Sequence, residues 1–223
     1  MVGENGTGPE TIVQDANGNF FGTTVFGGRK HDYGTVFEIT STNQFSVLHK
    51  FLRTEAVNPN MGLILANDGN FYGMTQGGGA NQEGAIYRIT PEGAYTTLYS
   101  FAYPQGYDPF AGPLFQATNG TFYGTTIYGP NPNFGTIFGF TNGLSPLVET
   151  APVAGKVGQS VIILGNGLTG STSVTFNGVQ AAFTVESDTY IKATVPKGAT
   201  TGTVSVFTPS GTLNSNPQFV VAK

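Results

Sequence analysis

Apolar and polar residues alternate in short runs through the first two thirds of the chain, and this alternation returns at a fixed spacing. Residues 17–24, NGNFFGTT, recur as DGNFYGMT at 68–75 and as NGTFYGTT at 119–126, a step of 51 residues both times. The segment GTVFEIT at 34–40 has its own counterparts, GAIYRIT at 84–90 and GTIFGFT at 135–141. Self-similarity at a fixed period is the signature of a repeat architecture, so the sequence predicts three copies of one structural unit.

Each unit is predicted to form four short antiparallel strands. An Asn-Gly or Asp-Gly pair joins the first strand to the second, and such pairs supply the positive φ angles of tight hairpin turns. In the third strand Val36 and Glu38 face one side of the sheet while Phe37 faces the other. The fourth strands are expected around Val47-Leu48, Thr97-Leu98 and Pro146-Leu147. Four antiparallel strands in about 50 residues is typical of a β-propeller blade.

The repeat ends near Val148, and the remaining 75 residues follow another pattern. Short apolar runs separated by Gly, Asn or Pro predict strands at 160–164, 172–176, 182–185, 190–195, 202–207 and 218–221. Six or seven such strands in so short a segment favour a small immunoglobulin-like sandwich. The predicted fold class is all-β: a partial β-propeller-like array of three four-stranded blades in residues 1–148, followed by an immunoglobulin-like β-sandwich in residues 149–223.

The second segment resembles a bacterial IPT/TIG domain. The resemblance rests on Val157-Gly158-Gln159-Ser160-Val161, Gly165-Asn166-Gly167-Leu168, Ser173-Val174-Thr175-Phe176-Asn177-Gly178, Ala193-Thr194-Val195-Pro196 and Gly198-Ala199-Thr200-Thr201-Gly202. It implies an accessory or ligand-contacting immunoglobulin-like module without catalytic residues of its own.

Residues 10–148 resemble the GloVer-type tandem repeats of bacterial choice-of-anchor surface proteins. The resemblance rests on the Asn/Asp-Gly-Asn-Phe-Tyr-Gly-Thr-Thr core, the Gly-Gly loop and the Gly-Thr-Val-Phe-x-Ile-Thr strand. It implies an extracellular or cell-surface setting and no particular reaction. The chain departs from the usual pattern where Ala102–Tyr107 stands in place of a Cys pair. Its three units also fall short of the four to eight blades of a closed propeller.

Composition narrows the classes of function. The chain has 33 Gly and 13 Pro, 10% charged residues and a net charge of −4, which favours a folded, turn-rich protein. The chain has only nine Lys and Arg residues, whereas a surface that binds nucleic acid is rich in them, so nucleic acid is not an expected partner. With no Cys and two His, we expect no metal site and no cofactor. No apolar run is long enough to span a membrane, and the first residues lack the pattern of a secretory signal peptide.

Few residues are candidates for chemistry, and we expect no catalytic residues and no enzyme. Residues 15–19, DANGN, have the alternate-oxygen spacing of a calcium loop, but the other units do not keep it, and a plain hairpin turn is favoured. His31 beside Asp32 lies in a polar segment that we interpret as a solvated loop. His49 is expected to be a half-buried strand residue. No Gly-x-Ser-x-Gly motif occurs, and distant carboxylates converging as in a glycoside hydrolase remain an open alternative.

Aromatic rings outside the repeat are the best candidates for ligand binding. The rings in or beside loops are Tyr33, Tyr103, Tyr107, Phe110 and Tyr128, of which we select Tyr33, Tyr103 and Tyr107. Flat rings with polar tips suit sugars or peptides, whereas the alternative role is to cover the spaces between blades. The sequence thus predicts a non-catalytic bacterial cell-surface or secreted binding and scaffold protein.

The expected partners are a glycan, a cell-wall polymer or a surface protein, together with self-association through open blade edges. The alternative function is an accessory, carbohydrate-contacting region of an extracellular carbohydrate-active enzyme.

Overall fold

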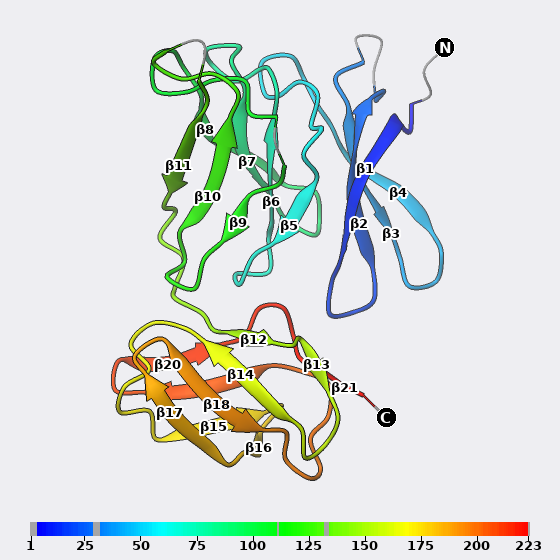
Figure 1. Cartoon of the computed structure of the whole chain (residues 1–223). Helices are drawn as coiled ribbons and strands as arrows, with labels where there is room; N and C mark the ends of the chain where they lie inside the picture. The colour runs from blue at the N-terminus through cyan, green and yellow to red at the C-terminus, as the bar shows by residue number, and fades with distance from the viewer. Residues whose placement is uncertain (1–3, 29–31, 111, 132–133, 223) are drawn as a thin grey trace. The chain divides into compact units, whose positions relative to one another are not determined.

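The computed structural model describes residues 4–28, 32–110, 112–131 and 134–222, and every regular element in these ranges is a β-strand (Figure 1). The all-β fold class is therefore confirmed. The chain divides into two compact units, Met1–Phe115 with Phe122–Phe140, and Gln116–Thr121 with Thr141–Lys223. Within the described ranges, no helix is long and apolar enough to cross a membrane.

The first two repeats form four-stranded antiparallel sheets, in which each strand pairs with the next along the chain. The strands of the first sheet are β1 (Thr7–Gln14), β2 (Phe20–Phe26), β3 (Thr35–Ile39) and β4 (Phe45–Lys50). Those of the second are β5 (Leu63–Leu65), β6 (Phe71–Thr75), β7 (Ala85–Ile89) and β8 (Tyr95–Ser100). The predicted hairpins are confirmed, because the turn glycines Gly18 and Gly69 have φ angles of 84° and 78°.

The third sheet has three strands, β9 (Phe115–Gln116), β10 (Phe122–Thr126) and β11 (Thr136–Phe140), so the prediction of a fourth strand in this unit was wrong. Pro146 lacks the N–H group that a strand ladder requires. Leu147 N donates instead to Thr118 O at 2.9 Å, and Val148 N donates to Asn214 O at 3.1 Å. Val148 is buried in the core of the second unit. Leu147 and Val148 therefore form hydrogen bonds within the second unit and do not extend the third sheet.

The sheets of the first unit pack face to face in chain order, with the second sheet between the first and the third (Figure 1). The rings of Phe21 and Phe71 lie 4.1 Å apart between the first two sheets, and those of Tyr72 and Phe122 lie 4.5 Å apart between the second and third. These four aromatic rings come from the repeated motif. The repeated motif therefore places one ring of each unit against a ring of the next unit.

The glycine in the middle of the motif permits a close approach of an aromatic ring. A methyl carbon on Gly22 would lie 2.6 Å from Cζ of Phe37, and one on Gly73 would lie 2.5 Å from Oη of Tyr87. At Gly124 the corresponding distance to Phe138 is 2.5 Å. Since real contacts are longer, each ring needs a glycine beneath it, which explains why this position is Gly in all three repeats.

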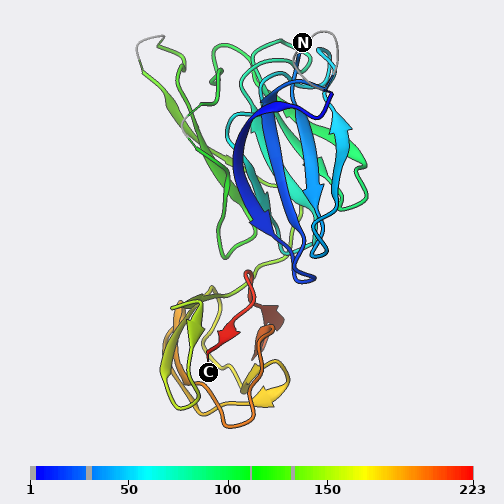
Figure 2. The same cartoon turned by 90° about the vertical axis from the view of Figure 1, so that its right-hand side faces the viewer.

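Within the first unit, the stack of described sheets is open at both ends. Figure 2 presents the first sheet to the viewer, on the face that no other described sheet of this unit covers. On the opposite end, Ile137 of β11 is 83% exposed, whereas the equivalent Val36 and Ile86 are fully buried by the next sheet. The propeller architecture remains a prediction, because three sheets in an open stack do not form a closed ring.

The second unit is a sandwich of two four-stranded sheets with a short parallel pair. The sheet orders are β12-β14-β18-β17, β16-β15-β19-β20 and β13-β21. The strands are β12 (Glu149–Ala151), β13 (Ala154–Gly155), β14 (Ser160–Leu164), β15 (Ser173–Phe176), β16 (Val179–Gln180), β17 (Phe183–Ser187), β18 (Tyr190–Thr194), β19 (Val204–Thr208), β20 (Gly211–Asn214) and β21 (Val220–Val221). Alternate residues of β14 and β18 enter a core that includes Ile163, Phe176 and Ile191. All six predicted strand segments are confirmed within a few residues.

Candidate functional site

Two connectors join consecutive sheets: the first, residues 51–62, runs from β4 to β5, and the second, residues 101–114, runs from β8 to β9. Their described residues hold the loops in place through repeated backbone hydrogen bonds. Val57 and Gly77 exchange two bonds, of 2.9 and 3.1 Å, and Tyr107 and Tyr128 exchange two at the equivalent place, of 3.0 and 3.3 Å. Asp108, with a φ of 55°, donates to Glu83 O and accepts from the next sheet. Because each connector is tied to two sheets, the side chains it carries have a fixed place, as a recognition surface requires.

Three tyrosines gather at the second connector, and we call Tyr103, Tyr107 and Tyr128 the tyrosine cluster. Tyr107 stacks on Tyr128 with ring centroids 5.0 Å apart and planes 24° apart, and Tyr103 meets Tyr107 nearly edge-on at 6.3 Å. Tyr103 is 62% exposed and Tyr128 is 36% exposed. The structure thus brings together two of the three rings selected from the sequence and adds Tyr128, whose place opposite Tyr107 follows from the connector's hydrogen bonds.

Tyr33, the third selected ring, lies at the first connector and does not join the tyrosine cluster. Its carbonyl accepts from Asn58 N at 3.2 Å, and its half-buried ring packs against the core between the first two sheets. In the neighbouring polar segment His31 lies outside the described residues. The Asp32 carboxylate accepts a hydrogen bond from Gly27 N. Tyr33 therefore covers part of the space between the first two sheets, which is the alternative role that the sequence analysis gave for the loop rings.

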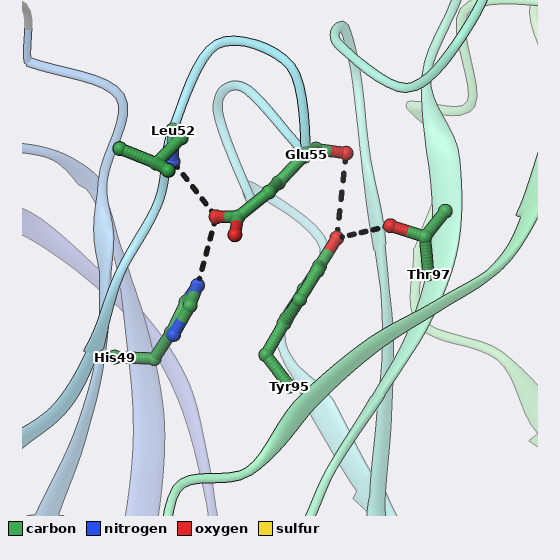
Figure 3. Close-up of polar contacts among 5 residues, drawn as sticks. All are labelled: His49, Leu52, Glu55, Tyr95 and Thr97. Carbon is green, nitrogen blue, oxygen red and sulfur yellow. Dashed lines mark hydrogen bonds and ion pairs between the residues drawn. The ribbon is translucent and has the colours of Figure 1, made fainter.

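A polar group at the boundary of the first two sheets joins His49 to Glu55 (Figure 3). His49 Nε2 lies 3.1 Å from Glu55 Oε2, and the same oxygen accepts from Leu52 N at 3.0 Å. Sequence reasoning missed this pair, because the two residues are six positions apart across a turn and no repeat or motif connects them.

Tyr95 of β8 completes the group (Figure 3). Its ring stacks on His49 with centroids 4.6 Å apart and planes 6° apart. Its hydroxyl donates to Glu55 O at 3.3 Å and lies 3.0 Å from Thr97 Oγ1. Burial raises the pKa of Tyr95 to about 12, so the phenol stays protonated to a higher pH than an exposed tyrosine. The Glu55 carboxylate is held by Leu52 N and by His49 of the first sheet, and the Glu55 backbone oxygen by Tyr95 of the second, so the group ties the first connector to both sheets.

A pocket of about 190 Å³ lies between the second and third sheets. Its wall combines aromatic and aliphatic side chains with the polar groups of Tyr99, Gln105 and Thr136. The lining residues are Ile86, Tyr99, Phe101, Gln105, Thr136, Phe138, Gly139 and Phe140. We call it the aromatic pocket.

The calcium-like segment forms a hairpin turn. The carboxylate of Asp15 accepts from Asn17 N at 2.9 Å and from Asn19 N at 2.8 Å, so its oxygens stabilise the turn. Among the residues that the structure describes, no three His, Asp or Glu side chains are grouped closely enough to hold a metal ion.

Comparison with known families accounts for both units. The profile of the Gloeobacter/Verrucomicrobia repeat matches residues 1–181, and that of the IPT/TIG domain matches residues 142–221. No curated protein matches the chain. Both resemblances noted in the sequence are thereby confirmed, and the immunoglobulin-like character of the second unit with them. The chain belongs to the Gloeobacter/Verrucomicrobia repeat family and carries an IPT/TIG domain after its repeats.

Proposed function

We propose that this chain is a non-catalytic binding and scaffolding part of a bacterial cell-surface or secreted protein, and that the tyrosine cluster contacts a glycan or cell-wall polymer. Repeat and IPT/TIG domains are in general binding modules and usually non-catalytic, which supports the class of function. The ligand class and the location are inferred from the residues and from the family resemblance.

The observation that carries the proposal is the display of the tyrosine cluster on a rigid connector. Tyr107 and Tyr128 are fixed by their backbone hydrogen bonds and stack on each other, while Tyr103 extends from the same connector into solvent. A tyrosine ring offers an apolar face to the C–H face of a sugar and a hydroxyl to its polar rim. A row of such rings is suited to a polymer with repeating sugar faces.

The affinity of one site should be weak. An exposed cluster buries much less of a ligand than a concave pocket does, so a single chain gains little apolar contact. A surface that presents many copies of the chain would bind a polymer through several sites at once, which raises the overall avidity without any new contact.

The site is tested with the full chain on an array of soluble glycans and cell-wall fragments, followed by titration of any ligand found. We expect Tyr103→Ala and Tyr107→Ala to weaken binding at least about tenfold together, the loss that truncating a contact aromatic commonly causes. Tyr123→Ala, an exposed ring on the outer face of β10, is the matched control and should bind normally. Unchanged binding by the double variant would refute the assignment.

A further inference from the structure

The outer edge of β11 lacks the neighbour that the equivalent strands possess. In the first two sheets, β3 pairs with β4 and β7 pairs with β8, both antiparallel. In the third sheet, β11 pairs with β10 on one side, and no described strand lies on the other. Such an edge presents free backbone N–H and C=O groups that can pair with another strand.

In the complete second sheet, one ring of the fourth strand fills the space between two sheets. Tyr95, paired with Ile89, stacks on His49 and lies 5.7 Å from Phe51 and 5.6 Å from Tyr87, centroid to centroid. Its hydroxyl donates to the backbone oxygen of Glu55. These contacts lock the fourth strand to the preceding sheet.

The aromatic pocket occupies the same place one repeat later. Each residue that Tyr95 contacts outside its own strand has a counterpart in the pocket wall: Tyr99 for His49, Phe101 for Phe51, Phe138 for Tyr87 and Gln105 for Glu55. The ring arrangement is kept as well, because Phe101 meets Phe138 edge-on at 5.2 Å as Phe51 meets Tyr87 at 5.3 Å. A volume of about 190 Å³ holds one six-membered ring, since a cavity of roughly 150 Å³ binds benzene.

We propose that β11 and the aromatic pocket form a peptide-binding site. An extended segment of another chain pairs antiparallel with β11 and places one aromatic side chain, opposite Phe140, into the pocket. Backbone pairing supplies affinity without sequence preference, and the pocket supplies specificity for the ring, as in other cases of strand addition to a sheet edge. The inference is independent of glycan binding by the tyrosine cluster.

The chain's own next segment is not the occupant. Three residues separate residues 144–148 from the end of β11, yet Leu147 and Val148 use their N–H groups in the second unit. Pro146 could not donate to the ladder. The fourth strand of the preceding repeat is therefore the best guide to the sequence of a ligand, because its Tyr95 contacts the residues that are equivalent to the pocket wall.

The test uses the full chain and a synthetic peptide of residues 94–101, AYTTLYSF. We expect saturable binding, with backbone NMR shifts concentrated on Thr136–Phe140. A peptide with Ala at the Tyr95 position should bind about tenfold more weakly or worse, because it no longer buries an aromatic side chain in the pocket. A peptide with Phe there should retain most of the affinity.

Two variants of the chain complete the test. Tyr99→Ala removes a wall of the pocket and should weaken binding of the parent peptide, whereas Tyr123→Ala, on the other face of the third sheet, should not. If the chain self-associates and the peptide dissociates it, the site is supported and a second copy is identified as a strand donor. Equal binding of the Tyr and Ala peptides, or no binding up to about 1 mM, overturns the proposal.

Discussion

The hydroxyl of Tyr87 is a buried polar group without a hydrogen-bond partner among the described residues. The residue is fully buried, and its ring lies over Gly73. Burial, with a smaller contribution from the nearby Tyr95, raises the pKa of Tyr87 well above its usual value. The equivalent residues of the other repeats are Phe37 and Phe138. We therefore predict that Tyr87→Phe stabilises the first unit.

The magnitude follows from the cost of the unpaired group. Leaving a buried hydroxyl unsatisfied costs about 1–3 kcal/mol, and Phe removes that cost while the ring keeps its packing. We expect the free energy of unfolding to rise by about 1 kcal/mol or more. For a chain of this size, each 1 kcal/mol raises the melting temperature by about 2–4 °C.

The assay is calorimetric unfolding of the full chain, with urea unfolding as a second measure. Tyr72→Phe is the matched control, because Tyr72 is also fully buried but donates to Asp68 Oδ2 at 2.9 Å. Losing that bond to a charged acceptor should cost about 1.5–3 kcal/mol. Opposite signs for the two variants support the reasoning. A lower melting temperature for Tyr87→Phe would refute it.

Three further outcomes are expected. Gly73→Ala should lower the free energy of unfolding by about 1–3 kcal/mol in urea, since the methyl would overlap Tyr87 Oη, and an unchanged midpoint would argue against this contact. The pKa of Tyr95 is raised from 10.0 to about 12, so its contribution to stability is complete below pH 10 and is lost as the pH rises through 12. Urea unfolding at increasing alkaline pH should show this loss of stability for the wild-type chain and a smaller loss for Tyr95→Phe. The chain should self-associate through the open sheet faces, and Ile137→Lys should reduce this in sedimentation velocity; a monomer at every concentration would contradict it.

Strand positions follow from sequence wherever local chemistry decides them. The Asn-Gly and Asp-Gly turns, the alternation at Thr35–Ile39 and the sandwich strand Ser160–Leu164 were all predictable, because turn geometry and a two-residue period depend on neighbours in the chain. The identity of both families followed from the same residues. These features are repeated or patterned, so each copy supports the others.

The features that the sequence did not predict depend on contacts between residues that are far apart in the chain. The apolar pair after Pro146 has the pattern of a fourth strand, yet Val148 packs into the second unit, where it is fully buried. Likewise, the stacking of Tyr107 on Tyr128 and of His49 on Tyr95 joins residues of different sheets or loops. Local propensity carries no signal for such contacts, because they depend on which surface the folded chain brings near.

The two proposed sites arise where the third repeat departs from the first two. At the first connector His49, Glu55 and Tyr95 form a closed group that holds neighbouring sheets together. One repeat later Tyr99 and Gln105 stand in place of His49 and Glu55, and no strand among the described residues supplies the ring, so the same framework leaves a pocket and an unpaired strand edge. The repeat therefore fixes the framework, and divergence from it creates the surfaces open to a partner. A fourth strand engineered onto β11 with a tyrosine opposite Phe140 should close the pocket and abolish peptide binding while leaving the tyrosine cluster's ligand bound.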